Sequence, residues 1–134
     1  MDDIPWDRLF EAAAAARERA YAPYSKFMVG SAVLFEDGVI YSGCNAENSS
    51  YSLTVCAERA AIFRAVVEGN RKLRAVAVVA DAGLPCPPCG SCRQVMAEFG
   101  GADTAVGFRS VSTGQEEKHP LQELLPYAFT KAYL

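Results

Sequence analysis

The spacing of apolar and polar residues along the chain predicts alternating helices and strands. Apolar side chains recur at helical spacing over residues 7–20, so we expect an amphipathic helix that ends before Pro23. Runs rich in β-branched and apolar residues predict strands at 27–35 and 39–42, joined through a Glu-Asp-Gly hairpin. The unbroken apolar run at 75–80 indicates a strand that is buried on both faces.

The rest of the chain continues this alternation. It predicts helices at 55–68, with Thr54 as N-cap, at 91–99 and in the segment 121–129, and strands at 104–108 and near 109–113. Strands that alternate with helices favour a sheet with parallel neighbours. The helix that starts at Leu121 is short and is stopped by Pro126. We therefore expect residues 1–134 to form one domain, an α/β fold with a three-layer α/β/α sandwich around a mixed five-stranded sheet.

Composition and charge narrow the class of protein. Hydrophobic residues make up 51% of the 134 residues and charged residues 22%, with a net charge of -3. The Lys and Arg residues are scattered, so we expect no nucleic-acid partner. No apolar run approaches the roughly 18 residues that a membrane span needs, and the acidic N-terminus lacks a signal pattern, so we expect no membrane association and a cytoplasmic location.

Five cysteines and one histidine are the candidate metal-binding or nucleophilic residues. Cys86, Cys89 and Cys92 form two overlapping Cys-x-x-Cys pairs. Cys89 and Cys92 lie at the start of a predicted helix, where free N–H groups and the helix dipole stabilise thiolates. Prolines 87 and 88 hold Cys86 and Cys89 in extended chain, so that pair is less suited to one ion. A redox dithiol is the alternative for the Cys89–Cys92 pair.

Two thiolates do not complete a zinc site, which takes three or four protein ligands. Cys44, Cys56, Cys86 and His119 are the further candidates. Cys56 also lies at a predicted helix start. Two residues later, Glu58 could reach over a metal ion held at the helix tip. We therefore predict that Cys56, Cys89 and Cys92 bind zinc with water in the fourth position, and that Glu58 carries protons. The alternative is a buried Cys56 that only packs, beside a solvated Glu58.

The Cys-Ala-Glu segment at 56–58 and the Pro-Cys-Gly-Ser-Cys segment at 88–92 together match the motif pair of zinc deaminases. The chain resembles the small homotetrameric cytidine deaminases over segments 21–33, 43–62, 88–96 and 121–129. Cys56, in place of a histidine, argues against a tRNA adenosine deaminase. The resemblance implies hydrolytic deamination of cytidine and 2'-deoxycytidine in pyrimidine salvage, one Zn²⁺ per subunit, and a homotetramer with active sites shared between subunits.

The resemblance also implies a role for further positions. They are Phe27 against the pyrimidine, Asn45 and Glu47 on the ribose 3'-hydroxyl, the Ala57 backbone on the base edge, Tyr51 and Phe129 from other subunits, and Arg59 on the zinc thiolates. A guanidinium at the last position has a physical reason, because three thiolates leave excess negative charge around a divalent cation.

Two other functions are compatible with the same cysteines. A non-catalytic zinc module would close the site with a fourth ligand, Cys86 or His119, leaving no place for water. A zinc enzyme acting on another aminated heterocycle would keep the open site. We predict that Cys44 and Cys86 are not ligands.

Overall fold

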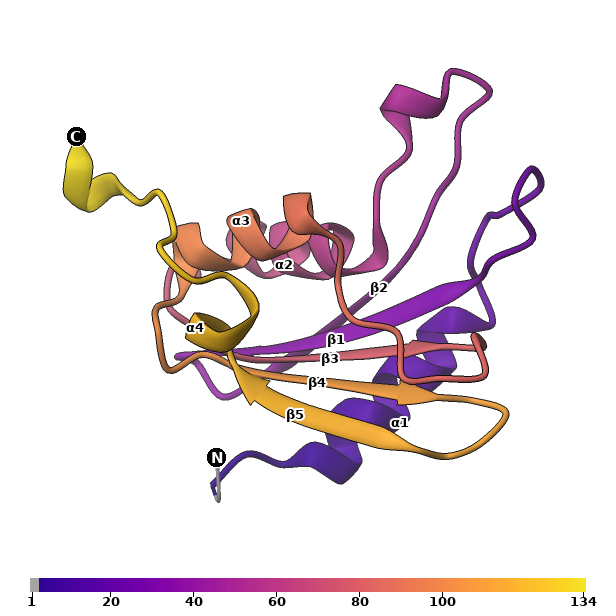
Figure 1. Ribbon diagram of the computed structural model, residues 1–134, viewed down its shortest axis with the longest axis horizontal. Helices are drawn as coiled ribbons and strands as arrows, with labels where there is room; N and C mark the ends of the chain where they lie inside the picture. The colour runs from indigo at the N-terminus through magenta and orange to yellow at the C-terminus, as the bar shows by residue number, and fades with distance from the viewer. Residues whose placement is uncertain (1–2) are drawn as a thin grey trace.

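The computed structural model describes residues 3–134 and contains a five-stranded mixed sheet with helices on both faces (Figure 1). The elements are α1 (Trp6–Arg17), β1 (Val29–Phe35), β2 (Ile40–Cys44), η1 (Tyr51–Leu53), α2 (Ala57–Val67), β3 (Leu73–Ala80), α3 (Gly90–Phe99), β4 (Ala105–Ser110), β5 (Glu116–Pro120), α4 (Leu121–Leu124) and η2 (Lys131–Tyr133). Helix α1 covers one face, and α2, α3 and α4 lie on the other (Figure 1). The predicted three-layer α/β/α sandwich is confirmed.

The order of strands explains why two helix starts lie close together. The sheet runs β2-β1-β3-β4-β5, and only β3 and β4 are parallel neighbours. The hairpin strand β1 lies between β2 and β3 and is antiparallel to both. The connections from β2 through α2 to β3 and from β3 through α3 to β4 cross the sheet in the same direction. Right-handed crossovers of this kind put both helices on one face, with both N-termini at the same end.

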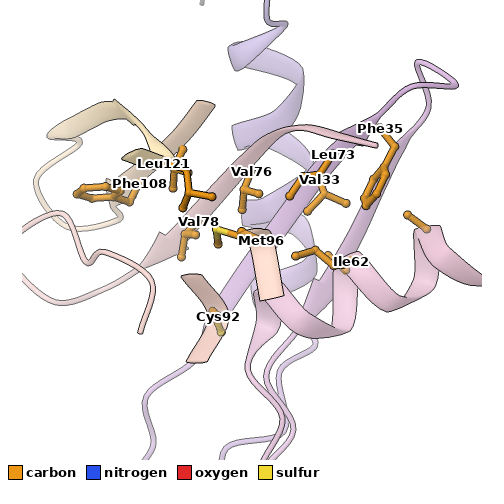
Figure 2. Close-up of a cluster of buried hydrophobic side chains, with 13 residues drawn as sticks. Val33, Phe35, Ile62, Leu73, Val76, Val78, Cys92, Met96, Phe108 and Leu121 are labelled. Atoms are coloured by element: carbon orange, nitrogen blue, oxygen red, sulfur yellow. The ribbon is translucent and has the colours of Figure 1, made fainter. Parts of the chain in front are cut away.

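Strand β3 lies at the centre of the core. Val76 and Val78 face the cluster under α2 and α3, where they meet Ile62 and Met96 (Figure 2). Ala75, Ala77 and Val79 face α1. Burial of a Val, Ile or Met side chain contributes about 1.5–3 kcal/mol, so this strand anchors both layers. The run at 75–80 is thus buried on both faces, as predicted.

Helix α2 lies directly on the end of β2. A Cβ on Gly43 would come within 2.6 Å of the Ala61 backbone nitrogen and 2.9 Å of the Ala57 carbonyl oxygen. Only glycine permits this approach, which holds the first turn of α2 in place. The position of Cys56, immediately before that turn, depends on this contact.

Two predicted elements are corrected by the structure. Helix α2 begins at Ala57 with Cys56 as N-cap, whereas Thr54 ends the turn η1. The fifth strand is β5 at Glu116–Pro120, and residues 111–113 form the turn before it. The polar segment 116–119 was not predicted as a strand because it lies at the sheet edge with mostly exposed side chains, so it has no apolar periodicity. Among residues 3–134, no helix is long and apolar enough to cross a membrane.

Candidate active site

Three cysteine thiols converge where α2 and α3 begin. Cys56 is the N-cap of α2, Cys89 is the N-cap of α3, and Cys92 lies in the first turn of α3. The three sulfur atoms all lie within 4.8 Å of one another. In the part of the chain that the structure describes, no other group of three or more His, Cys, Asp or Glu side chains has this arrangement. Cys86 and His119 are outside the group, so it offers three protein ligands.

The spacing of the sulfur atoms fits zinc. Zinc–sulfur bonds of about 2.3 Å in a tetrahedron place the sulfur atoms about 3.8 Å apart. The observed distances are 3.8 Å between Cys56 Sγ and Cys89 Sγ and 3.5 Å between Cys89 Sγ and Cys92 Sγ. Three soft ligands with an open fourth position are the donor set of a catalytic zinc ion rather than a closed structural one.

The surroundings favour an ionised Cys56 thiol beside a neutral Cys92 thiol, because the pKa of Cys92 is raised first by its hydrogen bond with Cys56 and then by burial. The pKa of Cys56 is lowered to about 5, first by the hydrogen bond with the Cys92 thiol and then by the Arg59 guanidinium. Arg59 Nη2 donates to Cys56 Sγ at 3.4 Å. Arg59 Nε is buried without a hydrogen-bond partner. Burial of an N–H group without a partner costs free energy, and the negative charge of the Cys56 thiolate next to the guanidinium offsets that cost.

Glu58 is a buried carboxylic acid beside the thiols. Its side chain is 4% exposed, and it lies in the first turn of α2, two residues after Cys56. Burial raises the pKa of Glu58 to about 7, and the negative charge of the Cys56 thiolate adds to this shift. A carboxyl with a pKa near neutrality can both accept and donate a proton at working pH.

A cavity of about 180 Å³ lies over the metal-binding group and Glu58. Its lining contains five of the predicted site residues besides Glu58: Phe27, Asn45, Cys56, Ala57 and Cys89. It also contains residues that the sequence did not indicate as site residues: Val29, Thr54, Val78, Cys86 and Pro87. Val29 lies two residues after Phe27, and residues two apart in a strand point to the same face. This spacing could have identified Val29 as a site residue. Val78 comes from the centre of β3 and had no local signal.

Asn45 holds the wall of this cavity together. Its Nδ2 donates to the Phe27 carbonyl oxygen at 2.8 Å, and its Oδ1 accepts from the Val29 N–H at 2.9 Å. These two bonds clamp the chain at the start of β1, which positions Phe27. One amide hydrogen and one oxygen lone pair are left for a ligand.

Glu47 and Tyr51 line an adjoining pocket of about 310 Å³, together with Tyr24, Ser25 and Thr54. Thr54 belongs to the lining of both spaces. The Glu47 carboxylate accepts hydrogen bonds from the Tyr24 N–H at 2.9 Å and from the Ser25 N–H and hydroxyl. The Ser25 hydroxyl is the main cause of the lowered pKa of Glu47, so this carboxylate stays charged.

Tyr51 and Phe129 do not enter the cavity of their own chain. Tyr51 is 74% exposed and Phe129 is 60% exposed. Phe129 stacks on Tyr133 with ring centroids 5.8 Å apart, and its carbonyl oxygen accepts from Gln94 Nε2 at 2.7 Å. The C-terminal tail leads away from the end of the molecule that carries η1 (Figure 1).

Comparison with known proteins agrees with this geometry. Residues 5–108 match the family model described as the cytidine and deoxycytidylate deaminase zinc-binding region. The chain is 52% identical over 125 residues to a cytidine deaminase of Sporosarcina psychrophila, which covers 93% of this chain and 91% of the relative. The crystal structure of cytidine deaminase from Burkholderia pseudomallei superposes with a TM-score of 0.89 at 46% identity, over 94% of this chain and 100% of that one.

A second solved structure leads to the same assignment. Cytidine deaminase from Mycobacterium tuberculosis gives a TM-score of 0.83 at 41% identity, over 95% of this chain and 98% of that one. Fold, zinc-compatible thiols and sequence identity over nearly the whole length therefore agree, and the chain belongs to the cytidine deaminase family.

Proposed function

We propose that this protein catalyses the zinc-dependent hydrolytic deamination of cytidine and 2'-deoxycytidine, which gives uridine or 2'-deoxyuridine and ammonia. One observation carries the proposal: the buried acid Glu58 and the thiols of Cys56 and Cys89 line the same small cavity. Family membership supports the substrate class, since the relatives described above are cytidine deaminases. Pyrimidine salvage is the metabolic role that fits these products.

Cys56, Cys89 and Cys92 would hold the zinc ion, which when bound supplies a Lewis acid that activates water. Arg59 donates to the Cys56 sulfur and offsets the negative charge of three thiolates, so that the ion stays electrophilic. Arg59 thus acts on the zinc-binding cysteines and does not contact the substrate.

Glu58 is the proton carrier in this mechanism. It takes a proton from the attacking water and donates it to ring nitrogen N3 while carbon C4 becomes tetrahedral. It then takes the proton of the new C4 hydroxyl and delivers it to the departing amine, which leaves as ammonia. A pKa of about 7 suits a group that must be protonated and deprotonated twice in each cycle. General acid–base catalysis of this kind is worth about 10²–10⁴ in rate.

The two adjoining pockets divide the substrate between base and sugar. The inner cavity of about 180 Å³ receives the pyrimidine, with Phe27 against the ring and the Ala57 backbone at its edge. The outer pocket of about 310 Å³ receives the ribose, where Glu47 lies. Thr54, common to both linings, marks the passage between them. Asn45 and Glu47 hold the 3'-hydroxyl with the hydrogen-bonding capacity that their contacts within the chain leave free.

Assembly completes the site in this proposal. Tyr51 and Phe129 are exposed aromatic side chains outside the inner cavity of their own chain, and Tyr51 also lines the outer pocket. We assign them to the active sites of neighbouring subunits in a homotetramer, with one zinc ion in each subunit. Its cytoplasmic location remains a prediction, supported by five cysteines that are all free thiols.

The direct test is purified protein mixed with cytidine, followed by ultraviolet absorbance and by ammonia release. We expect turnover that a chelator abolishes and zinc restores. Absence of turnover with cytidine and 2'-deoxycytidine in zinc-loaded protein would reject the proposal. A nucleoside panel then identifies any other aminated heterocycle. Loss of specific activity on dilution, together with light scattering, tests the shared sites, and active monomers would contradict them.

A further inference from the structure

Cys86 is a cavity residue to which the mechanism gives no task. Its side chain is half-buried and lines the inner cavity beside Pro87, Cys89 and Glu58. It is not part of the three-thiol group. Its thiol donates to the Pro87 carbonyl oxygen at 3.7 Å, a contact within its own loop. The residue therefore presents a small, weakly polar wall to the cavity.

The loop that carries Cys86 cannot readily retreat. Pro85, Pro87 and Pro88 fix the backbone φ angle on both sides of Cys86. Pro88 is fully buried, and its carbonyl oxygen accepts from Arg93 Nε at 2.8 Å. Arg93 Nη1 also donates to the Leu124 carbonyl oxygen at 2.6 Å, which ties the loop to α4. A larger side chain at position 86 would therefore take up cavity space and not displace the backbone.

The inner cavity has little spare volume. Its 180 Å³ is below the range of about 300–1,000 Å³ that is usual for ligand pockets. In the mechanism above, ring nitrogen N3 faces Glu58 on the α2 side. Ring carbon C5 lies on the other side of the amino-bearing carbon from N3, and we place it against the loop with Cys86 and Pro87, which lines the same cavity. This step rests on the proposed function.

We propose that Cys86 is a specificity-determining residue: its small side chain sets how large a substituent at C5 of the pyrimidine the enzyme accepts. The ligand class is 5-substituted cytidines. A methyl group at C5 has room because a thiol, and not a branched aliphatic side chain, forms that part of the wall.

The experiment compares kcat/KM for cytidine and 5-methylcytidine in the zinc-loaded wild type, Cys86→Ala and Cys86→Leu, with Cys44→Ala as the control. Cys44 lies outside both substrate pockets, and its thiol donates to the Arg19 carbonyl oxygen. We expect the ratio of 5-methylcytidine to cytidine to rise several-fold in Cys86→Ala. In Cys86→Leu it should fall by roughly tenfold or more, the usual effect of one misfit methylene-sized group. The control should keep the wild-type ratio.

A ratio within twofold of wild type in Cys86→Ala overturns the inference, and this variant serves even if the leucine variant does not fold. A wild type that turns over neither nucleoside overturns the proposed function instead. Zinc content measured in each variant should stay equal to that of the wild type, and a loss of zinc in Cys86→Ala would show that Cys86 acts on the metal site and not on the ring.

Discussion

Replacement of Glu58 by glutamine separates its role in catalysis from its effect on stability. Glutamine keeps the size of the side chain and can still form hydrogen bonds, but it cannot exchange a proton near neutral pH. We expect Glu58→Gln to keep the fold and the zinc ion and to lose about 10²–10⁴ in kcat, measured as ammonia release from cytidine. A variant that retains more than a tenth of the wild-type turnover would show that Glu58 is not the proton carrier.

The same variant should be more stable than the wild type when both are metal-free. The pKa of Glu58 is raised from an ordinary value of 4.5 to about 7, chiefly by burial. Above pH 7 the folded protein must hold a buried charge, which costs roughly 3 kcal/mol, since each tenfold change in proton affinity corresponds to about 1.4 kcal/mol. Below pH 4.5 the carboxyl is protonated in both the folded and unfolded states, and the cost disappears.

The sign of the pH dependence follows from proton uptake. Between pH 4.5 and 7 the folded wild type binds more protons at Glu58 than the unfolded chain does, so its stability falls as the pH rises through this window. Glu58→Gln lacks this decline. Urea unfolding of chelator-treated protein at pH 5 and pH 8 measures both curves, with exposed Glu98→Gln as the control. Equal stability of wild type and Glu58→Gln at pH 8 would refute the reasoning.

Four further variants test the ligands and the packing. Arg59→Gln should weaken zinc binding by about 10–100-fold in a chelator competition, because the thiolate charge is then uncompensated; unchanged affinity would exclude that role. Cys89→Ala should lose zinc in metal analysis while Cys86→Ala keeps it, and the reverse result would reject the ligand set. Gly43→Ala should lower the free energy of unfolding by about 1–3 kcal/mol, seen by calorimetry, because its Cβ meets the α2 backbone at 2.6 Å.

The fold could be predicted where apolar periodicity is strong. The unbroken apolar run at 75–80 predicts a strand buried on both faces, and this prediction is confirmed. The prediction of a fifth strand near 109–113 was wrong, because β5 lies at Glu116–Pro120. Its side chains face solvent and it is held by backbone pairing with β4, so it has no apolar pattern. The insertion of β1 between β2 and β3 depends on contacts between distant segments, which no local pattern encodes.

Some residues of the candidate site have a local signal in the sequence, and others do not. The thiols of Cys89 and Cys92 and the pair Cys56 and Glu58 have short, chemically meaningful spacings, so the sequence indicated them. The β1 clamp formed by Asn45 and the position of Val78 in the cavity wall depend on the packed sheet. They could be found only once the strands were in register.

The meeting of two helix starts above β3 has a consequence for the biogenesis of this protein. Before α2 and α3 dock, the chain offers only the local pair Cys89 and Cys92, because Cys56 lies 33 residues from Cys89. Tight capture of a metal ion must then wait until α2 and α3 have docked side by side on the sheet. We expect zinc loading to follow this docking step, so that its rate reports when the two helix starts have come together.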